Sequence, residues 1–102
     1  MRLSPGFSFA VESYGQYRMQ IRIKLYASLS KLLPEGVKPH EGFLLEIDDD
    51  MTPNRLVDTL NIPRPMAHLI LRNGTYIKPE DRDSALFKED DVFAVWPPVA
   101  GG

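Results

Sequence analysis

The chain has 102 residues, of which 43% are hydrophobic and 25% charged, a composition typical of one globular domain rather than a disordered or fibrous protein. Its net charge of -2 argues against a phosphate backbone as a ligand, so nucleic acid is not an expected partner. The absence of cysteine excludes disulfides, thiolate metal sites and a catalytic thiol. No apolar run approaches the ~20 residues of a membrane span, so we expect a cytoplasmic protein with no membrane partner.

The first 18 residues differ from the rest of the chain. They show no sustained hydrophobic period, contain Pro5, Gly6 and Gly15, and lack the pattern of a secretion signal. We expect residues 1–18 to be a flexible extension, with an ordered extra segment as the alternative. A sharper hypothesis is that Met19 is the natural initiator and that the preceding residues derive from an upstream start codon.

Two segments near the start of the domain have the alternating pattern of half-buried strands. The first begins at Met19, with apolar positions Ile21, Ile23 and Leu25. A short helical turn is expected over 28–33, and the Pro and Gly content of 34–42 predicts a loop. The second strand covers 42–47, with Phe43, Leu45 and Ile47 on one face, and we expect it to pair antiparallel with the first.

A helix is predicted to begin at Thr52-Pro53. Threonine is a favoured N-cap, and proline suits the first helical position because its missing N–H group would be unpaired there anyway. Leu56, Val57 and Leu60 form the apolar face, and Asn61 is the expected end.

The acidic run 48–50 before this helix does not predict a metal site. It lacks the glycine and distal glutamate of an EF-hand calcium loop. His40 and His68 have no second ligand at a metal-like spacing, so ordinary structural roles are expected for both.

The second half of the domain reads as a hairpin, a loop and a last strand. Residues 67–72 are apolar and end at Asn73-Gly74, the dipeptide best suited to a type I′ turn, after which Tyr76-Ile77 resumes. Residues 78–91 are mostly polar around Ala85-Leu86-Phe87 and predict an irregular loop with one apolar anchor. The last strand, 92–96, is apolar on both faces, which is typical of a central strand. The order β-β-α-β-β-β predicts an α+β domain over 19–96, a mixed sheet with one main helix packed across it, and this is the order of the β-grasp (ubiquitin-like) fold.

Residues 97–102 are expected to form an exposed tail. Pro97 and Pro98 fix φ and favour an extended path that holds the tail away from the sheet. The last four residues add a reach of ~13 Å at ~3.3 Å per residue. Gly101 and Gly102 lack Cβ atoms and could enter a narrow channel, leaving the terminal carboxylate as the reactive group.

The segment 91–102, a hydrophobic strand followed by Pro-Pro-Val-Ala-Gly-Gly, resembles the C-terminus of molybdopterin synthase small subunits (MoaD) in the MoaD/ThiS family of ubiquitin-like sulfur carriers. The resemblance extends more loosely back to Met19. One departure is Asp90, where the family commonly has glycine, but aspartate tolerates a left-handed conformation better than most residues.

The resemblance implies a sulfur-carrying subunit rather than an enzyme. A partner enzyme of the E1-like class (MoeB/ThiF-like) would use ATP to adenylate the carboxylate of Gly102, and a sulfur donor would convert it to a thiocarboxylate. The tail residues Pro97, Pro98, Val99, Ala100 and Gly101 would enter the large, MoaE-like synthase subunit, which transfers the sulfur to cyclic pyranopterin monophosphate. No bound cofactor is implied, and the choice between molybdenum and tungsten is left open.

The resemblance also leaves the partner surface and the acceptor open. Phe93, Val95, Trp96 and Val99 could contact the larger partner, although burial in the core of this domain explains some of them equally well. The alternatives to the molybdopterin assignment are the thiamine-pathway carrier (ThiS), a ubiquitin-like protein modifier and a non-covalent β-grasp interaction module. The pair Pro97-Pro98 favours the molybdopterin assignment.

Overall fold

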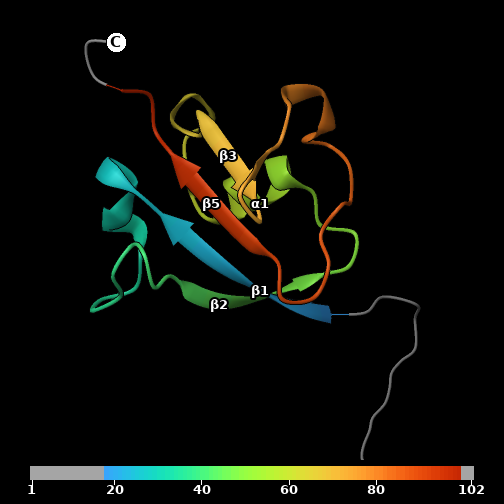
Figure 1. Ribbon diagram of the computed structural model, residues 1–102, viewed down its shortest axis with the longest axis horizontal. Coiled ribbons are helices and arrows are strands. Elements are labelled where there is room, and N and C mark those ends of the chain that lie inside the picture. The colour runs from blue at the N-terminus through green and yellow to red at the C-terminus, as the bar shows by residue number, and fades with distance from the viewer. Residues whose placement is uncertain (1–17, 100–102) are drawn as a thin grey trace, which may run out of the picture.

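The computed structural model describes residues 18–99 and contains a five-stranded mixed sheet crossed on one face by a short helix (Figure 1). The elements in chain order are β1 (Arg18–Leu25), the 3-10 helix η2 (Ala27–Leu32), β2 (Phe43–Asp48), α1 (Pro53–Thr59), η3 (Arg64–Met66), β3 (Leu69–Arg72), β4 (Thr75–Tyr76), η4 (Pro79–Asp81) and β5 (Val92–Trp96). The strand order is β2-β1-β5-β3-β4. This arrangement confirms the predicted β-grasp fold. Strand β1 begins at Arg18, and the predicted flexible extension otherwise lies outside the described residues.

The last strand is central, as its two apolar faces predicted. It pairs parallel with β1 and antiparallel with β3, while β2 and β4 form the two outer edges. Because β1 and β5 are adjacent and parallel, the C-terminal ends of both strands meet at one end of the sheet.

The core lies between one face of the sheet and α1. The alternating apolar residues of β1 and β5 point into it, and so does the apolar face of the helix. The fully buried members of this set are Ile21, Ile23, Phe93, Val95, Leu56 and Val57. Each side chain of this kind stabilises the fold by about 1.5–3 kcal/mol relative to exposure. Phe87 is 5% exposed and packs edge-on against Phe93, as expected for the anchor of its loop.

The helix begins and ends where the sequence predicts. The hydroxyl oxygen of Thr52 accepts a hydrogen bond from the backbone N–H of Arg55 at 3.2 Å, and Pro53 occupies the first turn. The helix ends at Thr59, and Asn61 then adopts a left-handed φ of 63°. Within residues 18–99, no helix has both the length and the hydropathy needed to cross a membrane.

Three tight turns depend on left-handed backbone. Asn73 and Gly74 have φ values of 52° and 83°, the signs that a type I′ turn requires. Asp90 has a φ of 69°, so the aspartate does adopt the conformation for which glycine would be usual. At Gly42, φ is +66° and an added Cβ atom would lie 2.2 Å from the carbonyl oxygen of Ile23. Glycine therefore lets the loop before β2 pass directly over β1.

Candidate functional site at the root of the C-terminal tail

Strand β5 carries the chain out of the sheet at the end opposite to the start of β1 (Figure 1). Trp96 is its last residue. Pro97 is still buried, whereas Pro98 is exposed and Val99 is 78% exposed. The exposed part of the described tail thus begins one residue later than predicted, because the first proline packs against the domain. Ala100, Gly101 and Gly102 lie outside the described residues.

The root of the tail is held by β1 and by the segment before β3. The backbone N–H of Tyr26 donates to the carbonyl oxygen of Val95, and that of His68 donates to the carbonyl oxygen of Trp96, both at 3.1 Å. The rings of Tyr26 and Trp96 stack with their centroids 4.2 Å apart and an interplanar angle of 4°. These contacts fix the position and direction from which the tail leaves the domain.

A groove of about 570 Å³ lies beside this root. Its walls are mostly apolar and come from three separate parts of the chain. They are formed by Ala27, Ser28, His68, Leu69, Trp96, Pro97, Pro98 and Val99. The groove is therefore continuous with the first residues of the tail, and a protein that binds the tail would meet it.

The proposed docking residues of β5 divide between the two faces of the strand. Phe93 and Val95 are 0% exposed and belong to the core, so their predicted docking role is corrected. Alternation places Val92, Ala94 and Trp96 on the face away from α1. Of the predicted docking residues, Trp96 is partly exposed and Val99, in the tail, is 78% exposed.

The face of the sheet away from α1 we call the open face. Around β5 it combines apolar residues with the cations Arg22 and Lys24. In register, Val92 lies beside Arg22, and Ala94 lies beside Lys24. On the other side of β5, Leu69 lies beside Trp96. This composition, with an aromatic residue next to the tail, is suited to contact with a protein surface.

The opposite end of β5 is fixed by a buried carboxylate. Asp91 is 4% exposed and accepts hydrogen bonds from Nε of Arg72 at 2.6 Å, Nδ2 of Asn73 at 2.8 Å and the backbone N–H of Lys88 at 2.8 Å. Oδ1 of Asn73 in turn accepts from the backbone N–H of Val92. Burial alone would raise the pKa of Asp91, but the bonds from Arg72, Asn73 and Lys88 outweigh it and hold the pKa below its ordinary value.

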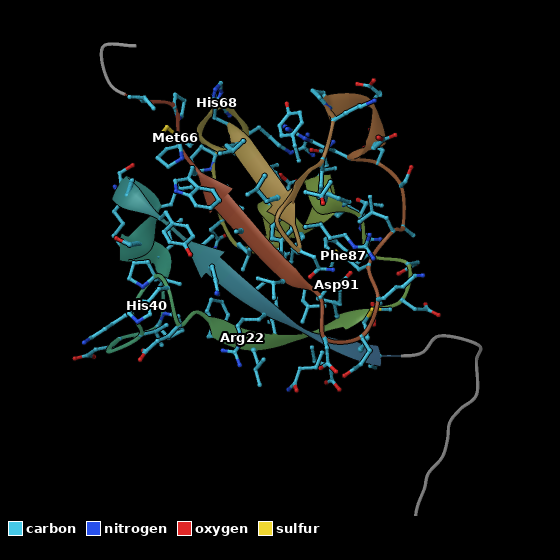
Figure 2. All side chains as sticks on the ribbon, in the orientation of Figure 1. Arg22, His40, Met66, His68, Phe87 and Asp91 are labelled. Atoms are coloured by element: carbon cyan, nitrogen blue, oxygen red, sulfur yellow. The ribbon has the colours of Figure 1, made fainter. Side chains whose placement is uncertain are left out.

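This cluster joins the hairpin turn to the start of β5 (Figure 2). Sequence reasoning noted Asp91 only as the residue before the last strand. The signal that could have drawn attention to it is an acidic residue between a left-handed position and a fully apolar strand.

The other polar residues of the described part of the chain show no arrangement typical of a metal site. Among residues 18–99, no group of three or more histidine, cysteine or acidic residues is arranged to hold a metal ion. His40 and His68 are both exposed and lie in different parts of the domain (Figure 2).

Comparisons with known proteins place this geometry in a family. The family model described as "ThiS family" matches residues 23–102. A search of curated protein sequences found no match. The five-stranded mixed sheet with one main helix is that of a ubiquitin-like β-grasp protein. Since the match covers most of the chain, the chain belongs to the ThiS family.

Solved structures share the fold. The HVO 2177 protein of Haloferax volcanii superposes with a TM-score of 0.65 at 20% identity, covering 83% of this chain and 88% of the other. SAMP1 of Haloferax volcanii gives 0.53 at 23% identity, covering 81% and 99%. The small archaeal modifier protein 1 of Methanosarcina acetivorans gives 0.53 at 20% identity, covering 84% and 99%. At these identities the likeness concerns the fold alone.

Proposed function

We propose that the chain is a sulfur carrier whose reactive group is the carboxylate of Gly102, and that it serves as the small subunit of molybdopterin synthase. The observation that carries the proposal is the sequence Pro-Pro-Val-Ala-Gly-Gly directly after the central strand β5, in a chain of the ThiS family. Support comes from the tail root, where Trp96 is stacked and hydrogen-bonded while Pro98 and Val99 are exposed.

The chemistry requires no catalytic side chain from this protein. A carboxylate is a poor electrophile, and an E1-like partner would use ATP to convert that of Gly102 to an acyl-adenylate with release of pyrophosphate. Sulfide from a sulfur donor would then attack the acyl carbon, displace AMP and leave a thiocarboxylate. The protein itself would supply reach and narrowness: the four residues 99–102 span ~13 Å at ~3.3 Å per residue, and the two glycines add no side-chain width.

The partners would recognise the surface around the tail. We propose that Trp96 and the groove at its side contact the large, MoaE-like subunit and the MoeB/ThiF-like activating enzyme. Large aromatic side chains in such positions often dominate the energy of an interface. Since Phe93 and Val95 are buried, their contribution is to hold β5 in place.

A second candidate is a ubiquitin-like modifier, in which Gly102 becomes linked to lysine amines of other proteins. It has support from two proteins of similar fold, SAMP1 of Haloferax volcanii and the small archaeal modifier protein 1 of Methanosarcina acetivorans. A third candidate is the thiamine-pathway carrier, which would deliver the sulfur of the same thiocarboxylate to thiazole synthesis, in keeping with the name of the family. The pair Pro97-Pro98 before the tail favours the molybdopterin assignment.

The experiment compares acceptors directly. Thiocarboxylated full-length chain is mixed with the host's molybdopterin synthase large subunit and cyclic pyranopterin monophosphate, or with the host's thiazole-forming enzyme and its substrates. We expect molybdopterin to form in proportion to the thiocarboxylate consumed, and a chain lacking Gly102 to form none. Sulfur transfer only to thiazole, or accumulation of isopeptide-linked conjugates in cells without either product, would contradict the molybdopterin assignment.

A further inference from the structure

Strand β2 forms one outer edge of the sheet, and no other described strand lies beyond it (Figure 1). The edge runs over six residues, Phe43–Asp48, and contains no proline. The opposite edge, β4, has only two residues. An unpaired edge of this length offers its backbone N–H and C=O groups to any strand of suitable sequence.

The hydrogen bonds between β1 and β5 show which backbone groups of β2 point away from the sheet. The N–H groups of Arg22 and Tyr26 donate to the carbonyl oxygens of Asp91 and Val95, on the β5 side of β1. The N–H groups of Ile21 and Ile23 therefore point toward β2. In the register of the two strands, Ile21 faces Leu45 and Ile23 faces Phe43.

The intervening residues Leu44 and Glu46 therefore direct their N–H and C=O groups outward. No hydrogen bond to another described residue uses these four groups. The edge thus presents a repeating donor and acceptor pattern, which a second strand could satisfy with good geometry.

The two faces of the strand along this edge differ in polarity. On the helix side, Phe43 and Leu45 are only partly buried, although both pack against the core. On the open face, Leu44 is 51% exposed and Glu46 is also exposed. An added strand would thus place alternate side chains beside apolar and acidic surface.

The acidic charge of this edge is only loosely neutralised. Arg18 lies 3.8 Å from the carboxylate of Glu46, which is exposed, and 3.4 Å from that of Asp48, which is partly exposed. Ion pairs near the surface contribute little to stability, so the carboxylates of Glu46 and Asp48 are still able to accept another cation. Asp49 and Asp50 continue the acidic run directly after the strand.

The same charges disfavour a second copy of this chain as the occupant. Two β2 edges that paired antiparallel through their outward residues could do so in three registers. These place Glu46 of one copy opposite Glu46, Asp48 or Leu44 of the other. Two of these three registers place like charges directly opposite each other, which is destabilising. A strand with cations in those positions has no such conflict.

We propose that the outer edge of β2 binds an extended segment of another protein in which basic residues alternate with apolar residues. The segment adds a sixth strand to the sheet through the backbone of Leu44 and Glu46. Its apolar side chains lie beside Phe43 and Leu45. Its lysine or arginine stems cover Leu44 while their charged ends meet Glu46 and Asp48. This site is separate from the tail and does not depend on the proposed sulfur chemistry.

The test is an NMR titration of the full-length, ¹⁵N-labelled chain with a peptide of about eight residues that alternates lysine and valine. We expect the amides of Leu44 and Glu46 to shift and to gain protection from hydrogen exchange. The amides of Phe43 and Leu45 already pair with β1 and should gain little protection. A peptide that alternates glutamate and valine serves as the charge control and should bind at least about tenfold more weakly.

Two further controls separate backbone pairing from simple charge attraction. Methylating alternate backbone amides of the lysine-valine peptide removes its donors without touching the protein, and should abolish the protection at Leu44 and Glu46. The variant Glu46→Gln keeps the strand intact and should weaken binding about two- to fivefold. The methylated peptide keeps the test decisive even if an edge variant were to unfold.

Three results would overturn the proposal. The first is equal binding of the lysine-valine and glutamate-valine peptides. The second is a set of shifts confined to the open face around Val92, Ala94 and Trp96. The third is the same shifts at Leu44 and Glu46 on raising the protein concentration without peptide, which would assign the edge to a second copy.

Discussion

Replacing Asp91 by asparagine tests the buried cluster at the start of β5. The carboxylate accepts two bonds at Oδ2, from Arg72 and the backbone of Lys88, and one at Oδ1, from Nδ2 of Asn73. An amide has only one acceptor oxygen. If that oxygen takes the place of Oδ2, the amide NH₂ group faces the NH₂ group of Asn73, which cannot turn over without losing its bond from Val92.

The cost can be worked from this geometry. A buried donor left unpaired costs about 1–3 kcal/mol, and the loss of negative charge beside Arg72 adds to it. Arg72 is 29% exposed by its side chain, so this second contribution is smaller than for a fully buried pair. We expect Asp91→Asn to lower the free energy of unfolding at pH 7 by about 2–3 kcal/mol in urea denaturation.

The pH dependence supplies an internal check. The folded-state pKa of Asp91 lies below its ordinary value, so the stabilisation is fully present above the unfolded pKa of ~3.9 and is lost as the pH falls through the folded pKa. The difference between wild type and Asp91→Asn should be constant from pH 7 to about pH 5 and shrink below about pH 4. The matched control is Asp58→Asn, because Asp58 also pairs with an arginine, Arg64, but on the surface. This reasoning would be refuted if Asp91→Asn lowered the free energy of unfolding only slightly, or by the same amount as Asp58→Asn.

Two other substitutions test the loop over β1 and the root of the tail. Gly42→Ala should lower the free energy of unfolding by about 2–4 kcal/mol, because it adds left-handed strain to a contact with the backbone of Ile23. In the matched variant Gly36→Ala, φ is also positive but no atom lies within 4 Å, so a loss of only about 1 kcal/mol is expected; equal losses in urea denaturation would disprove the steric argument. Trp96→Ala should raise the KM of the activating enzyme for this protein about tenfold while the domain remains folded. Tyr76→Ala removes an exposed aromatic side chain from the far edge strand and should leave that KM unchanged, and the reverse order of effects would rule out a docking role for Trp96.

Most of the fold could be predicted because local signals agreed with the tertiary structure. The alternation from Met19 to Leu25, the Thr52-Pro53 start and the Asn73-Gly74 turn each reflect a backbone requirement that few residues satisfy. Asp90 also follows from a local rule, since aspartate is among the few residues that tolerate a positive φ.

The site was less predictable because its parts meet only in three dimensions. Both faces of β5 are apolar, so alternation could not tell which face would meet the helix, and Phe93 and Val95 proved to be core residues. The burial of Pro97 and the stacking of Tyr26 on Trp96 arise where two distant strands end together. Asp91 finds its partners in the hairpin and in the preceding loop, at separations that no motif describes.

The most direct test of the central proposal is the intact mass of the full chain after incubation with ATP, a sulfide source and the host's E1-like enzyme. The same reaction is run on a chain that lacks Gly102. Our account predicts that one oxygen is replaced by one sulfur on the full chain alone. An unchanged mass, with an activating enzyme shown to be active on another carrier, would contradict it and favour a non-covalent interaction module.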